Sequence, residues 1–199
     1  MRSDVIRVSS SGKGVAEALS TAERVAAYKG LSKKDTLHLR LLTEEMMGML
    51  QGLTGETEAE FFIEDENNSF RLHLITYTAM DAEKRRRLIS SSTSGKNAAV
   101  KGVMSKIRDL FQQAFEPLEG DGVSFYTTGW VHHPDSGVID FSIYDSAWSF
   151  NQYRVSVKDA EEWDELEKSI VANLADEVSI GVNKNKVEMI IYKRIGEKK

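Results

Sequence analysis

Side chains that could do chemistry are sparse in this sequence, and the clearest group is the polar run Ser94-Gly95-Lys96-Asn97 ahead of an expected helix. Backbone N–H groups at the start of a helix, together with a lysine, suit a bound anion such as a phosphate. The run lacks the Gly-x-x-x-x-Gly-Lys pattern of a P-loop, so a polar loop that binds nothing is the competing interpretation. The adjacent histidines at 132 and 133 could bind a metal, but adjacent residues rarely converge on one ion without further ligands.

Composition argues against several other kinds of site. The chain has no cysteine, so it offers no thiolate nucleophile, disulfide or cysteine-based metal site. Its formal net charge of −5 disfavours a general nucleic-acid binder. The first residues lack the apolar core of a signal peptide, and no apolar run reaches membrane length, so a cytoplasmic protein without a membrane span is expected. His38 and His73 have no evident partner in the sequence.

Two helices that could position functional side chains are expected in the first quarter of the chain. The alanine-rich stretch 15–29 is followed by Gly30, a residue typical of a helix end. The second helix begins near Ser32, which has Asp35 three residues later, and extends to about residue 53. Its apolar residues recur at spacings of three and four and mark the buried face: Leu39, Leu42, Met46, Met49 and Leu53.

The remaining pattern predicts strands with shorter helices between them. A first strand is expected over 5–8, and alternation over 59–64 and 70–75 predicts a hairpin turned by residues 64–68. A β-rich segment is expected over 120–158, then a helix over about 159–175 and a closing hairpin turned by residues 183–186. This order predicts an α+β two-layer sandwich in which a mixed or antiparallel sheet carries helices mainly on one face.

The closing helix and hairpin at 174–193 resemble those of the small anti-sigma-factor serine kinases, members of the histidine-kinase-like (GHKL) ATPase family. In that family the second helix presents a glutamate and, four residues later, an asparagine on one helical face. The resemblance implies that the glutamate acts as general base or orients the attacking water, while the asparagine oxygen holds magnesium. Glu44 matches the glutamate, although for this residue taken alone an exposed helix glutamate beside Glu45 is the simpler explanation.

The asparagine position of this motif is occupied by Gly48, which offers no side-chain oxygen to magnesium. A glycine in the middle of a helix costs about 1 kcal/mol relative to alanine. We therefore expect some group to approach the backbone closely at Gly48.

The family's second motif, Asp-x-Gly-x-Gly, binds adenine and is also altered. Thr76 falls at the aspartate position after the first hairpin, and Thr78 and Met80 replace the glycines. In another register Asp145 is followed by small residues at the motif's spacing, but it lies much further from Glu44 than is usual. The third motif, a glycine-rich lid that closes over the phosphates, is matched only by the Gly95-Lys96 pair.

Together these residues predict a single GHKL-like domain over 1–199, with about 90–158 inserted or divergent. The leading hypothesis is a degenerate ATP-binding domain that acts as a regulatory module with a protein partner. ATP and magnesium are the ligands that the resemblance implies, bound weakly or not at all because Gly48 replaces the magnesium ligand.

Two alternatives stay open. The first is a working ATP-binding protein, such as an anti-sigma-factor-like serine kinase, in which Glu44 keeps its role and Asp145 or another group supplies the missing contacts. The second is an unrelated α+β sandwich that binds a partner through the segment 120–158. The sequence leaves open whether the chain is an enzyme and whether it forms a homo-oligomer.

Overall fold

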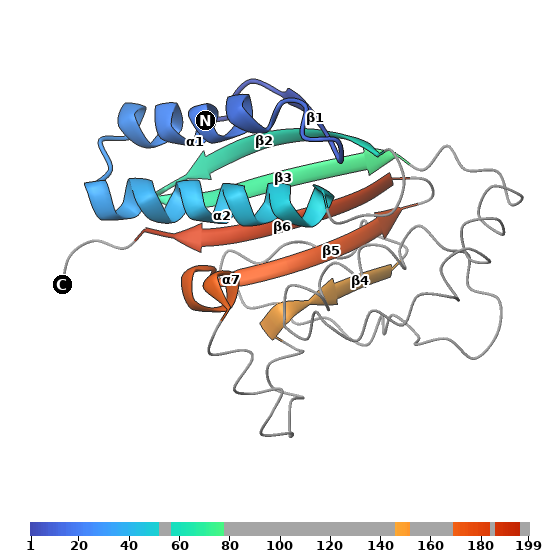
Figure 1. The fold of residues 1–199 in the computed structure, drawn as a ribbon. Coiled ribbons are helices and arrows are strands. Elements are labelled where there is room, and N and C mark those ends of the chain that lie inside the picture. Colours follow the sequence, from blue (N-terminus) through green and yellow to red (C-terminus); the bar gives the residue numbers. More distant parts are fainter. Residues whose placement is uncertain (52–56, 78–145, 152–168, 184–185, 196–199) are drawn as a thin grey trace, which may run out of the picture.

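A computed structural model of the chain describes residues 1–51, 57–77, 146–151, 169–183 and 186–195. Within these ranges, six strands form one sheet in the order β1-β2-β3-β6-β5-β4 (Figure 1). The strands are Ile6–Ser9 (β1), Glu58–Glu66 (β2), Ser69–Tyr77 (β3), Ser146–Ser149 (β4), Glu177–Asn183 (β5) and Lys186–Arg194 (β6). The helices are Val15–Tyr28 (α1), Lys33–Gln51 (α2) and Ile170–Leu174 (α7).

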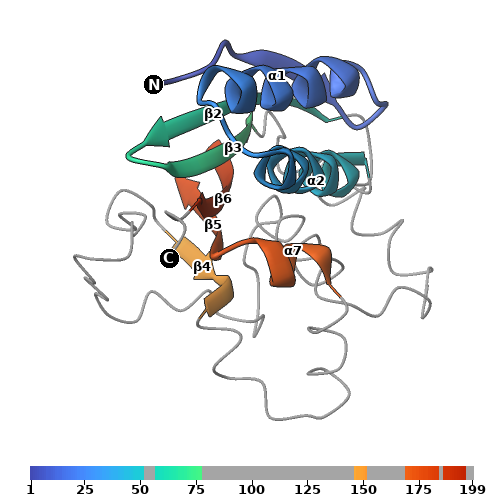
Figure 2. The same cartoon turned by 90° about the vertical axis from the view of Figure 1, so that its left-hand side faces the viewer.

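The three described helices lie on one face of this sheet, as Figure 2 shows. Every described strand pairing is antiparallel. The predicted α+β class is therefore confirmed, and the sheet is antiparallel in its described part. The helix predicted over 159–175 is described only from residue 169 onward, and there it forms α7. Of the β-rich segment predicted over 120–158, only residues 146–151 are described, and they include the strand β4.

The core lies between the sheet and the helices because alternate side chains of the strands point to that face. Phe61 of β2 pairs with Leu74 of β3, which pairs in turn with Met189 of β6. All three are fully buried, and the predicted residues Leu39, Leu42, Met46 and Met49 of α2 are buried as well, whereas Leu53 lies outside the described residues. The buried residues of α2 are Leu39, Leu42, Thr43, Met46, Met47, Met49 and Leu50.

The β2–β3 hairpin closes through a tighter turn than the one predicted over residues 64–68. Glu66 still pairs with Ser69, so only Asn67 and Asn68 lie outside the two strands. Their φ angles are 48° and 61°. Asparagine tolerates positive φ better than most residues, and two such residues give a turn whose twist matches the strands. The predicted turn was too long because the charged residues before Asn67 continue β2.

The junction between α1 and α2 follows the predicted signals. Gly30 adopts a φ of 65°, and the Leu31 N–H donates to the Ala26 carbonyl at 3.0 Å, which ends α1. Ser32 then starts α2. Its hydroxyl accepts from the Asp35 N–H at 3.1 Å and donates to the Asp35 carboxylate at 2.6 Å. Aspartate thus takes the place that glutamate usually has in this capping arrangement.

A partly buried carboxylate on β5 binds the backbone just after β4, the last strand of the described sheet. Glu177 Oε1 accepts from the Asn151 N–H at 3.2 Å and from the Val178 N–H at 3.0 Å. Burial raises the pKa of Glu177, and the backbone N–H groups that it binds partly oppose this rise. The turn after β4 is held in place, and Phe150 within it reaches the core.

Candidate functional site

The outer face of α2 carries the two positions that the GHKL resemblance singles out. Glu44 and Gly48 lie one helical turn apart, and both are exposed. Their outward position follows from burial of Leu42 and Met46, which fixes the rotation of the helix against the sheet. Figures 1 and 2 show α2 lying over β3 and β6, the paired inner strands of the two hairpins.

The expectation that a group approaches the backbone closely at Gly48 is wrong within the described residues. A Cβ placed on Gly48 meets no atom within 4 Å. The glycine lies on the solvent side of the helix and does not adopt a positive φ. Packing within the described structure therefore gives no reason for glycine at this position.

We expect Gly48→Ala to raise the free energy of unfolding by about 1 kcal/mol, because alanine restricts the unfolded chain and favours the helix. Urea unfolding followed by far-ultraviolet circular dichroism measures this change. Ala27→Gly, at an exposed position of α1, is the matched reverse substitution and should cost a similar amount. A loss of stability in Gly48→Ala would show that a group does pack against this glycine.

The Glu45 carboxylate, beside Glu44, lies in an environment that disfavours its charged form. Burial raises the pKa of Glu45, and the neighbouring charge of Glu44 raises it further. A carboxyl whose pKa is higher in the folded protein binds its proton more tightly there, so its charged form costs stability at neutral pH. That cost disappears once the pH falls below the ordinary glutamate value of about 4.3.

We therefore expect Glu45→Gln to raise the melting temperature at pH 7. The gain should be small, below about 1 kcal/mol, because Glu45 is partly exposed and water screens its charge. It should shrink as the pH is lowered from 6 toward 4, which thermal unfolding across that range would reveal. Glu44→Gln removes only the weaker of the two causes and should give a smaller gain. A gain that grows toward acid pH would contradict the sign of this effect.

The other positions matched to the family are placed as follows. Thr76 lies buried near the end of β3, on the face that carries Leu74, and its hydroxyl donates to the Glu58 carbonyl at 2.9 Å. This hydroxyl is therefore engaged within the sheet. Gly95, Lys96 and Asp145 lie outside the described residues. The pair that the described structure brings together on one surface is Glu44 with Gly48.

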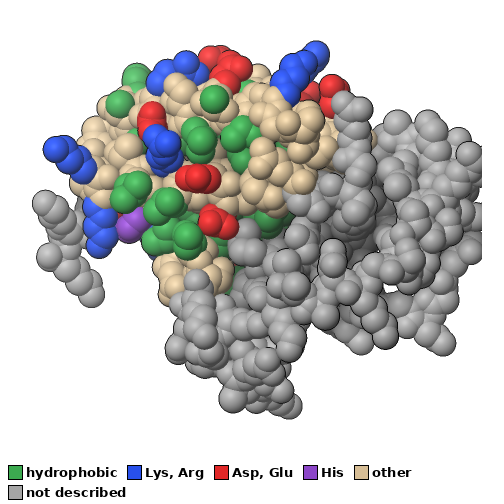
Figure 3. All heavy atoms as spheres, in the orientation of Figure 1, with side chains coloured by type: hydrophobic (Ala, Val, Ile, Leu, Met, Phe, Trp, Pro, Cys, Tyr) green, Lys and Arg blue, Asp and Glu red, His purple; other side chains and the backbone are tan. Residues whose placement is uncertain are grey.

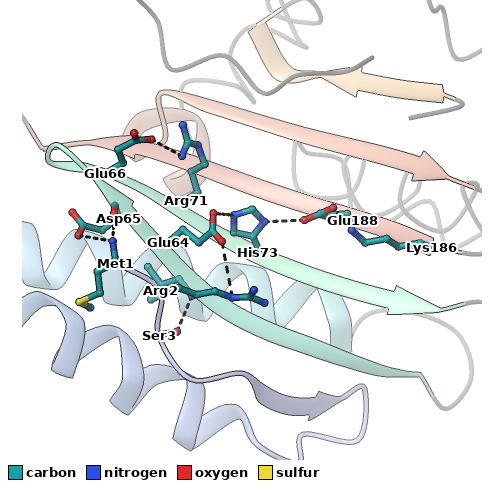
Figure 4. Close-up of polar contacts among 11 residues, drawn as sticks. Met1, Arg2, Ser3, Glu64, Asp65, Glu66, Arg71, His73, Lys186 and Glu188 are labelled. Atoms are coloured by element: carbon teal, nitrogen blue, oxygen red, sulfur yellow. Dashed lines mark hydrogen bonds and ion pairs between the residues drawn. The ribbon is translucent and has the colours of Figure 1, made fainter. Parts of the chain in front are cut away.

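A polar cluster that the sequence did not reveal lies on the opposite face of the sheet (Figure 4). His73 of β3 stacks on Phe62 of β2, with ring centroids 4.5 Å apart and planes 9° from parallel. Its Nδ1 lies 2.8 Å from Glu188 Oε1, and its Nε2 lies 3.6 Å from Glu64 Oε2. The imidazole thus sits between two carboxylates, although no partner was evident in the sequence.

Two cations complete this cluster, one at each end. Lys186 Nζ lies 2.7 Å from Glu188 Oε2, and Arg2 Nε lies 4.0 Å from Glu64 Oε1. The Arg2 guanidinium also covers the Phe62 ring, 3.9 Å from its centroid. Two carboxylates, one imidazole and two cations therefore form a chain of contacts that runs from Arg2 across β2 and β3 to Lys186 of β6. This arrangement compensates the charge of the buried Glu188 carboxylate. Within the described residues, no three or more His, Asp or Glu side chains are placed so that they could hold a metal ion.

An open depression of about 370 Å³ lies at the turn end of the β2–β3 hairpin. Its lining comprises Met1, Arg2, Glu64, Asp65, Glu66 and Arg71. Asp65 Oδ2 pairs with Lys29 Nζ at 2.7 Å, and Glu66 Oε2 pairs with Arg71 Nη1 at 3.6 Å. Since Glu64 faces Arg2 and His73, each of the three carboxylates in this depression already has a cationic or imidazole partner.

The helix-bearing side of the molecule is mixed in character. Figure 3 shows acidic, basic and apolar side chains interspersed on the described part of this face. None of the helices in the described ranges has the length and apolar character that a membrane span requires.

Comparisons of the chain with protein-family models, curated proteins and solved structures found no match.

Proposed function

We propose that this chain is a degenerate GHKL-type ATP-binding domain that acts as a regulatory, protein-binding module. The main support is the position of α2, because the helix that carries Glu44 lies over the strands β3 and β6 (Figure 1). A nucleotide approaching its outer face would find the Glu44 carboxylate exposed and one helical turn from Gly48. It would find no side-chain oxygen for magnesium at that second position.

Loss of the magnesium ligand is the reason to propose a regulatory role. Magnesium requires closely placed oxygen ligands and neutralises the phosphate charge of bound ATP. An α2 face that offers the Glu44 carboxylate but no side-chain oxygen at position 48 lacks the magnesium ligand that the family places there, so it should hold the Mg–ATP complex poorly. The fold and its surfaces remain available for binding a regulatory protein partner.

Restoring the missing oxygen tests this proposal directly. The space around the Gly48 Cβ is open within the described residues, so Gly48→Asn introduces an amide without a clash there. Asparagine is no worse than glycine in a helix, so the fold should be kept. We expect the affinity for Mg–ATP, measured by calorimetry, to rise at least about tenfold, which corresponds to roughly 1.4 kcal/mol. The gain should vanish when EDTA removes magnesium.

Gly48→Ala is the matched control, because it adds a Cβ and favours the helix but supplies no oxygen. Wild type and Gly48→Ala should bind Mg–ATP equally weakly. If Gly48→Asn behaves like both of them, Gly48 does not occupy a magnesium-ligand position and the GHKL assignment loses its support. Adding Glu44→Ala to the asparagine variant should reduce the restored binding.

The alternative of a working ATP-binding protein or serine kinase is favoured by one observation. Glu44 is exposed and makes no ion pair with another described residue, which is the position that a nucleotide-contacting carboxylate requires. Saturable Mg–ATP binding by the wild type, weakened by Glu44→Ala, would support this alternative over the degenerate domain. Release of phosphate from ATP would then decide whether the protein is an enzyme.

A further inference from the structure

We draw no further inference here: the strongest candidate, the partly buried His73–Glu188–Glu64 cluster on the sheet face opposite α1 and α2, pairs its carboxylates with the imidazole, Lys186 and Arg2, and nothing in the described residues shows which ligand would reach it.

Discussion

Replacing Gly14 with alanine should lower the free energy of unfolding by about 3 kcal/mol or more, through the combined cost of overpacking and backbone strain. Gly14 precedes α1 with a φ of 78°, a conformation that L-residues rarely adopt. A Cβ there would lie only 2.1 Å from the Arg7 carbonyl oxygen and 3.2 Å from Val8 Cγ1. The nearest obstacle is backbone of β1, so the clash can be relieved only by moving the strand or the start of the helix.

The matched control is Gly30→Ala. Gly30 also has a positive φ, of 65°, but a Cβ there meets no atom of the described residues within 4 Å. This variant therefore isolates the conformational penalty, about 1–2 kcal/mol. Urea unfolding of both variants separates the two effects. Equal losses would mean that the contact with Arg7 contributes nothing and that β1 does not pack against Gly14 as described.

Replacing Glu188 with leucine should also be costly, by about 3 kcal/mol, because breaking a buried ion pair leaves its partners without compensation. The Glu188 side chain is only 7% exposed and contacts both His73 and Lys186. Without it, His73 Nδ1 loses its buried acceptor and the Lys186 ammonium loses its closest carboxylate. Equilibrium unfolding in urea at pH 7 measures the loss.

A double-mutant cycle distinguishes a true pair from two independent losses. Glu188→Leu combined with His73→Leu removes both buried polar groups, so the double variant should lose less than the sum of the single variants, by roughly 1–3 kcal/mol. Glu66→Gln is the exposed control, since its side chain is 70% exposed and pairs with Arg71 at 3.6 Å. It should change stability by less than about 1 kcal/mol. Strict additivity at His73 and Glu188 would contradict the coupling.

Local periodicity was enough to predict the elements that build the core. The spacing of Leu39, Leu42 and Met46 predicted the buried face of α2, and it also determines that Glu44 and Gly48 point outward. Alternation in the closing hairpin likewise predicted the inward position of Met189. These predictions succeed because helix and strand geometry alone decides which side chains share a face.

The polar cluster could not be predicted in this way because its contacts depend on strand register. His73 and Glu188 are 115 positions apart in the chain and meet through the pairing of β3 with β6. A shift of one residue in that register would turn Glu188 toward the helices. The residues expected to bind the nucleotide fall into two groups. The shared exposed face of Glu44 and Gly48 follows from helical spacing, whereas Gly95, Lys96 and Asp145 lie outside the described part of the chain.

The loop after β1 has a further consequence for how the protein behaves at high concentration. The Ser9 N–H donates to the Lys13 carbonyl, and the Ser9 carbonyl accepts from the Gly12 N–H, both at 3.0 Å. The Arg7 carbonyl lies against Gly14. The outward-pointing backbone groups of Ser9, at the end of β1, are thus occupied by the segment that follows the strand. A foreign strand therefore cannot pair with Ser9, which hinders strand addition, and the aggregation that follows from it, at this end of β1.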